Sequence, residues 1–265
     1  MSMMRLVTAV ALLGVASSIL AAPQRRAAPR QSKPALARQF DPKTYAASIE
    51  GVDCSNVASR ASSVTPIEPA LRGIANAYPY GPPVKGEFES SAAFDQRVLG
   101  ELSAKLGGTN RVVAVIPIRD MAGYDADTST MTINPVASRI KENVITVKAY
   151  SGIDRHGHFV GSNAYGATAE VSRETFTQFY MLLPARSRMS MKVSMDPETA
   201  RSFKDKGSLV LVGSLLSPYI AYERTRGRAT IGDPTDTTYL KFYLGIVAQC
   251  AVVTSNGQEV GRFEL

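Results

Sequence analysis

The chain has 265 residues, 45% of them hydrophobic and 20% charged, which are values of a globular protein long enough to bury a sizeable core. Trp is absent, and the formal net charge is +7. A charge of this sign and size is typical of proteins that bind nucleic acid or anionic membranes. Most of this positive charge lies N-terminal to the expected folded part, which argues against nucleic-acid binding.

The N-terminal residues have the layout of a secretory signal peptide. Arg5 supplies a short positive segment, residues 6–20 form an apolar run without charge, and the small residues Ala21 and Ala22 follow. A membrane-spanning helix needs about 20 residues, so an uncleaved anchor is the less favoured alternative. We expect cleavage after residue 21, no transmembrane segment after cleavage, and a periplasmic or secreted location.

The basic charge is concentrated directly behind this segment. Residues 22–43 carry six Lys and Arg against Asp41 and are rich in Pro, Ala and Gln, which is typical of a disordered linker. Such a linker either serves as a solvated spacer, which we favour, or makes weak contact with anionic surfaces. Residues 44–265 are then nearly neutral, and we expect them to form a single β-rich domain.

Three segments have helical signals. A short helix is expected over 70–78, and a clearer one begins at Ser90 or Ser91, either of which suits an N-cap. Apolar residues then recur near the helical period: Phe94, Val98, Leu99, Leu102 and Leu106. The glycines at 107–108 predict the end of this helix. Asp196, Pro197 and an acidic residue begin a third, short helix that ends near residue 207.

Most of the remaining chain is strand-like. The β-branched run 111–118 predicts a central strand. Further strands are expected over 130–136, 143–150, 159–161, 167–173, 176–183, 189–195, 208–216, 239–254 and 258–265. About ten strands, two or three helices and no regular alternation of the two predict an α+β fold. We expect a mainly antiparallel sheet or sandwich with two or three packed helices.

Cys54 and Cys250 are the only cysteines of the chain. In an oxidising compartment two distant cysteines predict a disulfide, which would pin the Ser- and Pro-rich stretch around Cys54 to a C-terminal strand. Two buried free thiols are the alternative.

An acidic segment suggests a calcium site at first sight. Asp125, Asp127 and Ser129 match the first three odd positions of an EF-hand loop. Thr130 then stands where the loop needs glycine, and Val136 where it needs a bidentate glutamate. A polar turn, in which Asp side chains bond their own backbone, is therefore favoured over calcium binding.

His156 and His158 are the only histidines. On a strand, two residues two positions apart share a face, so both rings could reach one metal ion. Residues 154–158 also suit the tip of a hairpin, which we favour. We expect no cofactor and no metal, with Asp125, Asp127, His156 and His158 as the weak candidates for a metal site.

Other chemistry has little support in the sequence. The chain has neither a Gly-x-Ser-x-Gly elbow nor a glycine-rich phosphate-binding loop. Arg224, Arg226 and Arg228 alternate as on one side of a strand. This pattern suits either an edge strand protected by charge, which we favour, or a surface for an anionic polymer.

Three local patterns together resemble a group of exported bacterial proteins of unknown function. They are an EFE-x4-F-x2-R helix motif at 87–97, a YDAD turn at 124–127 and an SNAYGA motif at 162–167. The resemblance implies a periplasmic or secreted location and no particular activity.

These observations favour an exported, non-enzymatic binding or structural protein of the bacterial cell envelope. Its partner would be another envelope protein or polymer, and not nucleic acid. The alternative is a secreted hydrolase, with or without a metal ion, that uses the region of Asp125 and Asp127 or that of His156 and His158.

Overall fold

The structure of the protein is a computed structural model that describes residues 50–79, 81–141, 144–162, 166, 168–184, 189–230 and 232–265. All of these belong to one compact unit of the chain, residues 37–265. The expected signal peptide, 1–21, and the expected linker, 22–43, lie outside the described residues. The fold is α+β and rich in strands, as the sequence predicted.

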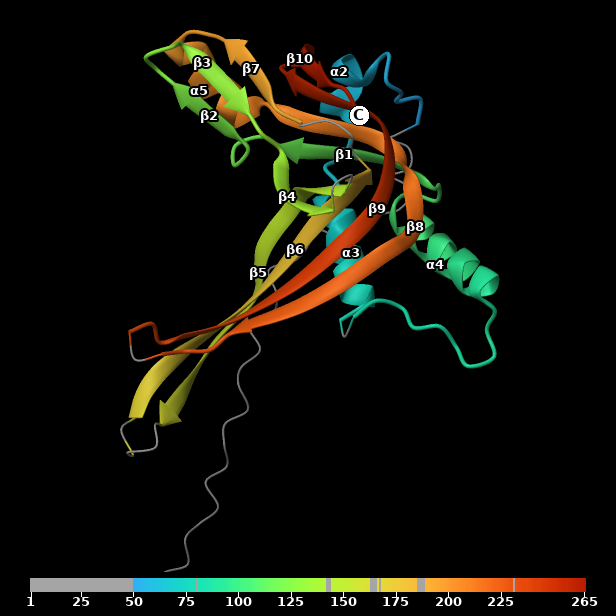
Figure 1. The fold of residues 1–265 in the computed structure, drawn as a ribbon, viewed down its shortest axis with the longest axis vertical. Coiled ribbons are helices and arrows are strands. Elements are labelled where there is room, and N and C mark those ends of the chain that lie inside the picture. Colours follow the sequence, from blue (N-terminus) through green and yellow to red (C-terminus); the bar gives the residue numbers. More distant parts are fainter. Residues whose placement is uncertain are drawn as a thin grey trace, which may run out of the picture. The chain divides into compact units, whose positions relative to one another are not determined.

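The described residues form ten strands in two sheets (Figure 1). Their bounds are β1 Arg111–Pro117, β2 Ala122–Asp125, β3 Thr130–Ile133, β4 Val136–Lys141, β5 Val144–Ser162, β6 Thr168–Pro184, β7 Met191–Ser194, β8 Ser208–Gly227, β9 Thr235–Ser255 and β10 Gln258–Phe263. Sheet A has the order β1-β8-β9-β6-β5-β4, with β10 paired to β9, and sheet B has the order β2-β3-β7. All pairs are antiparallel except β6 with β9, which is parallel.

Of the four α-helices among the described residues, two begin at a residue whose side chain caps them. The four helices are α2 Val57–Arg60, α3 Glu68–Ala77, α4 Ser91–Lys105 and α5 Pro197–Lys206, with a 3-10 turn at Ala61–Ser63. The Ser90 side chain accepts a hydrogen bond from the Ala93 N–H and caps α4, and the Asp196 side chain caps α5. The N–H of Gly108, which has a positive φ, bonds the Ser103 carbonyl past the end of α4. The predictions for these two helices are confirmed.

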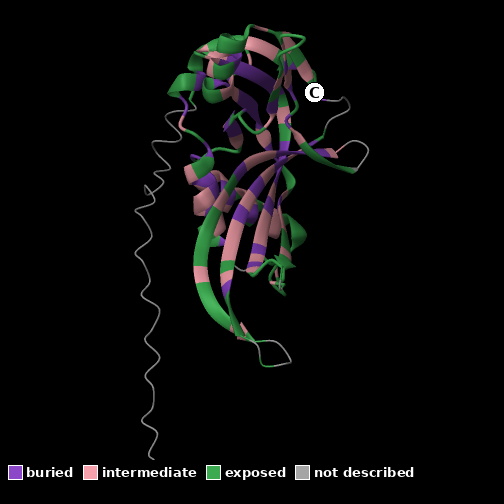
Figure 2. Ribbon diagram, turned by 90° about the vertical axis from the view of Figure 1, so that its left-hand side faces the viewer, coloured by how far each residue is buried: buried purple, intermediate pink, exposed green. Residues whose placement is uncertain are grey.

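The four long strands of sheet A differ from the predicted ones in two ways. β5 joins the predicted strands 143–150 and 159–161, and β6 joins 167–173 and 176–183, whereas β8 and β9 extend beyond 208–216 and 239–254. These strands continue side by side as what we call the arm: residues 148–162, 168–182, 219–227 and 235–245. Figure 2 shows buried residues gathered in the body and exposed residues toward the end of the arm. The arm ends as a ribbon of β5 and β6 alone, because β9 begins opposite Ser172.

Two expectations about strands are wrong. The run 111–118 forms β1, which lies at the end of sheet A and pairs with β8 alone, although its residues are buried. Burial by the layers above and below it gives the apolar composition that suggested a central strand. Residues 154–158 are not a hairpin tip but lie within β5, paired with β6, in a part of the arm where β5 is mostly exposed and therefore accepts polar residues.

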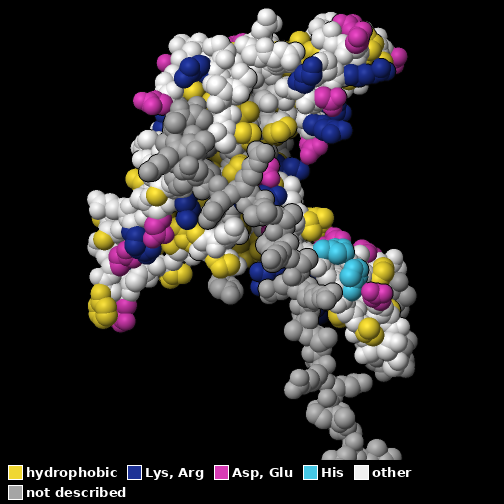
Figure 3. All heavy atoms as spheres, turned by 180° about the vertical axis from the view of Figure 1, so that it is seen from behind, with side chains coloured by type: hydrophobic (Ala, Val, Ile, Leu, Met, Phe, Trp, Pro, Cys, Tyr) yellow, Lys and Arg dark blue, Asp and Glu magenta, His cyan; other side chains and the backbone are white. Residues whose placement is uncertain are grey.

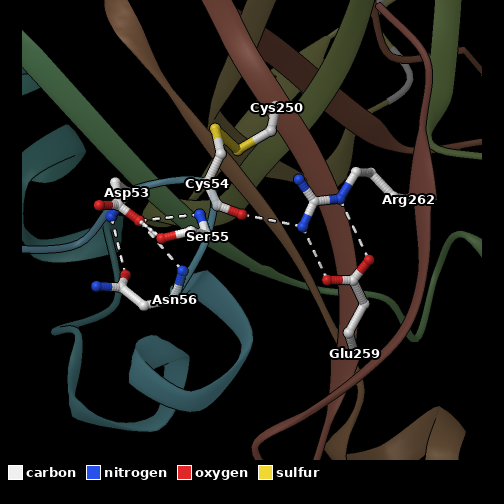
Figure 4. The surroundings of a disulfide bond; sticks show 7 residues. All are labelled: Asp53, Cys54, Ser55, Asn56, Cys250, Glu259 and Arg262. Atoms are coloured by element: carbon white, nitrogen blue, oxygen red, sulfur yellow. Dashed lines mark hydrogen bonds and ion pairs between the residues drawn. A yellow bond between two sulfur atoms is a disulfide. The ribbon is translucent and has the colours of Figure 1, made fainter.

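Cys54 and Cys250 form a disulfide, with Cα atoms 5.9 Å apart (Figure 4). The bond joins the segment before α2 to β9, as the sequence predicted. Arg262 of β10 donates to the Cys54 carbonyl at 2.9 Å and also binds Glu259. Asp53 accepts from the N–H groups of two following residues, so side chains and backbone hold this irregular segment on both sides of the disulfide.

The core lies between sheet A and the helices. Phe179 and Phe242 stack across β6 and β9, with ring centroids 4.8 Å apart, on the face that α3 and α4 cover. The side chains that these helices bury completely are Ala70, Leu71, Ile74 and Leu102. Among the described helices, none has the length and apolar character required to cross a membrane.

Candidate functional site

A hollow of about 620 Å³ lies beside the first residues of β4, at the point where β5 ceases to pair with β4. Ligand pockets have volumes of about 300–1,000 Å³, so the hollow is large enough for a small molecule or part of a polymer. Its walls come from α3, from the turn between β1 and β2, from the segment entering β4, and from β5 and β6. The residues that line it and bear on its chemistry are Glu68, Arg72, Arg119, Asp120, Lys148, Tyr150, Ser151 and Tyr180.

Tyr150 is the most constrained of these residues. It is 9% exposed, and its hydroxyl has no hydrogen-bond partner among the described residues. The guanidinium of Arg72 lies 4.9 Å from the centroid of its ring, and burial raises the pKa of the hydroxyl. The hydroxyl lies against Gly152, where a Cβ atom would collide with it. The ring is therefore held in one place at the wall of the hollow.

The charges of the hollow are unevenly paired. Arg72 binds Glu68 at 3.0 Å. Within the described residues, Arg119, Lys148 and Asp120 have no ion pair. Two unpaired cations against one unpaired carboxylate make the hollow slightly favourable to an anionic group.

The hollow continues onto one face of the arm. Register places twelve residues of that face in three rows that cross β5, β6, β9 and β8. We call these rows the open face: Ile153, Phe176, Tyr239 and Thr225; Ser151, Gln178, Lys241 and Glu223; Lys148, Tyr180, Tyr243 and Ala221. The helices cover the opposite face, and the residues of the open face are half-buried or exposed.

Aromatic rings and polar groups alternate on the open face. Phe176 stacks with Tyr239, and Tyr180 stacks with Tyr243, with centroids 5.1 and 5.3 Å apart. The Tyr180 hydroxyl donates to Gln178 at 3.1 Å, and the Tyr243 hydroxyl donates to Glu223 at 2.9 Å. Burial raises the pKa of both tyrosines, with Glu223 adding to the effect, so both remain protonated near neutral pH.

The acidic candidates for a metal site lie elsewhere. Asp125 ends β2, and Asp127 lies in the turn to β3, in sheet B. The Asp125 side chain accepts from the N–H groups of Asp127 and Thr128, at 3.0 and 3.4 Å. Hydrogen bonding by the Thr128 side chain, together with these N–H groups, holds the pKa of Asp125 below its usual value. The segment is thus a polar turn, the interpretation that the sequence favoured.

The histidine candidates lie on β5 in the outer part of the arm, and Figure 3 shows them from behind in cyan. His156 and His158 share a face of β5, and their rings meet edge to face with centroids 4.9 Å apart. Their Nδ1 atoms are 3.5 and 3.6 Å from carboxylate oxygens of Glu174 and Glu170. The structure therefore does not bring the histidines together with Asp125 and Asp127. Across the described ranges, no group of three or more His, Cys, Asp or Glu is arranged to hold a metal ion.

The 87–97 motif has a visible structural role. Arg97 of α4 binds Glu89 through two nitrogens, at 2.9 and 3.1 Å, and also donates to the Val84 carbonyl. This pair clamps the loop before α4 onto the helix. The Arg97 hydrogen bonds lower the pKa of Glu89 to about 2. Most of the SNAYGA motif, 163–165 and 167, lies outside the described residues.

Sequence reasoning missed the hollow and the open face. A signal was present, because Phe176 and Tyr180 recur four residues apart, as do Tyr239 and Tyr243. The pairing of these rings depends on β6 and β9 being parallel neighbours, which no local pattern indicates.

No model of a protein family matches the chain, and no curated protein or solved structure does. The site is therefore interpreted from its own geometry and chemistry.

Proposed function

We propose that the protein is an exported, non-enzymatic binding protein of the bacterial cell envelope, and that the hollow and the open face form its binding site. The observation that carries this proposal is the hollow itself: its volume suits a ligand, its charges are partly unpaired, and it continues onto a polar and aromatic sheet face. The signal-like N-terminus and the resemblance to exported proteins support export.

The chemistry of the lining favours binding over hydrolysis. Glu68 is engaged by Arg72, which leaves Asp120 as the unpaired carboxylate of the described lining. Hydrolysis by paired carboxylates needs two such groups at a fixed separation. The histidine and aspartate candidates lie on different sheets and do not converge on the hollow.

Charge reversal at the hollow tests the binding site. Arg119→Glu should weaken binding of the purified protein to solubilised envelope fractions, measured as the ligand-induced rise in Tm. Arg201→Glu, the same change at an exposed position of α5, is the matched control and should leave the rise unchanged. An equal effect of the two variants, or no rise with any fraction, would contradict the proposal.

Export is tested separately. Fractionation of the producing cells should place the protein in the envelope or medium, and N-terminal sequencing should begin at Ala22. A cytoplasmic protein that keeps Met1 would contradict this part of the proposal.

A further inference from the structure

The open face has the composition of a surface that binds sugars. Each row crosses four strands, so neighbouring residues are about 4.8 Å apart, and the three rows together span roughly 14 Å by 14 Å. A sugar ring has apolar C–H groups on its faces and hydroxyls at its rim. The C–H groups can pack against the aromatic rings of Phe176 and Tyr239, and the hydroxyls can form hydrogen bonds with polar side chains.

The middle row supplies those hydrogen-bonding groups. Gln178 lies between Ser151, which its amide reaches at 3.4 Å, and Lys241, which lies 3.8 Å from Glu223. With the protonated hydroxyl of Tyr243 beside them, these residues offer both donors and acceptors. Preformed side-chain contacts hold them in place, so that less conformational entropy is lost when a ligand binds.

The strand edges of the arm are poorly suited to the other common ligand of a sheet, an added strand. In the described part of the chain, β5 beyond β4 pairs with β6 alone, but two register shifts interrupt it, between Lys148 and Tyr150 and between Ile153 and Arg155. On the other edge, β8 carries Arg224 and Arg226. Bulges and charges are the features that protect edges from strand addition. The face is therefore a better surface for a ligand than the edge.

The charge at one end of the face indicates what the sugar carries. Lys148, Ser151 and Tyr180 belong both to the open face and to the hollow, so a ligand on the face extends into the hollow. There it meets Lys148 and Arg119, which have no ion pair within the described residues. Carboxylates are the groups that such cations bind well.

We infer that the open face binds a polysaccharide strand that carries carboxylate groups, with sugar rings on the aromatic rows and a carboxylate in the hollow. This inference rests on the proposed function and names the ligand class of that site.

Calorimetric titration of the purified protein with a uronic acid oligosaccharide tests the inference. Methyl esterification of the same oligosaccharide removes its charges and should weaken binding by about tenfold or more, because a charge-assisted hydrogen bond is lost. Lys148→Gln should weaken binding of the free acid but not of the ester. Tyr243→Phe should weaken both, whereas Tyr124→Phe in sheet B, a matched loss of one hydroxyl, should weaken neither.

The outcomes separate this inference from the proposed function. Equal binding of acid and ester, or equal binding of polyglutamate or anionic lipid vesicles, would overturn the carboxylated sugar as the ligand while leaving a binding site in place. If the protein does not bind the oligosaccharide but its Tm still rises with envelope fractions in a charge-dependent way, the inference is overturned and the proposed function is not. No response to either would overturn both.

Discussion

Tyr150 has the only buried side-chain polar atom without a hydrogen bond among the described residues. Its ring packs beneath Arg72, and its hydroxyl lies against Gly152, so the side chain has little room to turn toward a partner. An unsatisfied buried hydroxyl destabilises a fold by about 1–3 kcal/mol. Because Tyr150 lies at the wall of the hollow, this destabilising hydroxyl belongs to the proposed binding site.

Tyr150→Phe should therefore raise the free energy of unfolding of the unliganded protein by about 1 kcal/mol, because it removes the unpaired hydroxyl and keeps the ring. Urea denaturation measures the change. Tyr243→Phe is the matched control and should lower the same quantity by up to about 1 kcal/mol, since its hydroxyl bonds Glu223. A loss of stability in Tyr150→Phe as large as that of the control would show that the Tyr150 hydroxyl has a partner in solution.

Among the elements, the arm depends on the parallel pair of β6 and β9. Asp236 lies at the start of β9, is 4% exposed, and receives two hydrogen bonds from Arg226 of β8, at 3.1 and 2.7 Å. Arg173 of β6 is 3.5 Å from the same carboxylate. One carboxylate thus joins three strands near the end of the arm. The Arg226 guanidinium holds the pKa of Asp236 below its usual value.

This lowered pKa predicts how the pair responds to pH. The stabilisation is complete above the unfolded pKa of Asp, about 3.9, and is lost as the pH falls through the lower folded pKa. Asp236→Asn should therefore reduce the free energy of unfolding at pH 7, and the difference from wild type should shrink below about pH 4. Urea denaturation at several pH values measures this.

Asp127→Asn, at an exposed position of the β2–β3 turn, serves as the control for this experiment and should change stability little at any of these pH values. A difference between Asp236→Asn and wild type that stays constant from pH 7 to pH 3 would argue against the ion pair as its cause.

In the whole molecule, the disulfide joins the beginning of the described chain to its last long strand. Cys54 and Cys250 are 196 residues apart, so the bond closes a loop that contains nearly all of the fold. A cross-link of this kind stabilises mainly by restricting the unfolded chain, and more so for long loops. The hydrogen bond from Arg262 to the Cys54 carbonyl holds the same segment without the disulfide.

Reduction should lower the free energy of unfolding by up to about 5 kcal/mol and expose the segment around α2 to proteolysis. Denaturation with and without reductant measures the first effect. The double variant Cys54→Ser/Cys250→Ser should have the stability of the reduced protein and be insensitive to reductant. Two reactive thiols in the unfolded, non-reduced protein would contradict the pairing.

Sequence alone predicted much of the fold but little of the site. The start of α4 at Ser90 and that of α5 at Asp196 follow from hydrogen bonds within one turn. β5 and β8 were predicted too short, because exposed arm residues such as those at 154–158 lack the apolar alternation of a half-buried strand. The position of the hollow depends on where the pairing between β4 and β5 stops, and no local sequence pattern indicates that point.

The amino-acid sequence by itself determined the α+β class, the ends of α4 and α5 and the partners of the disulfide. These follow from capping within a few residues, from periodicity and from there being only two cysteines to pair. Only the tertiary structure decided that β6 and β9 are parallel neighbours, that Tyr180 stacks on Tyr243, and that Tyr150 and Lys148 line one hollow. The reason is physical: the pairing and register of strands depend on contacts between residues far apart in the chain, and the energies of these contacts add up over the whole core.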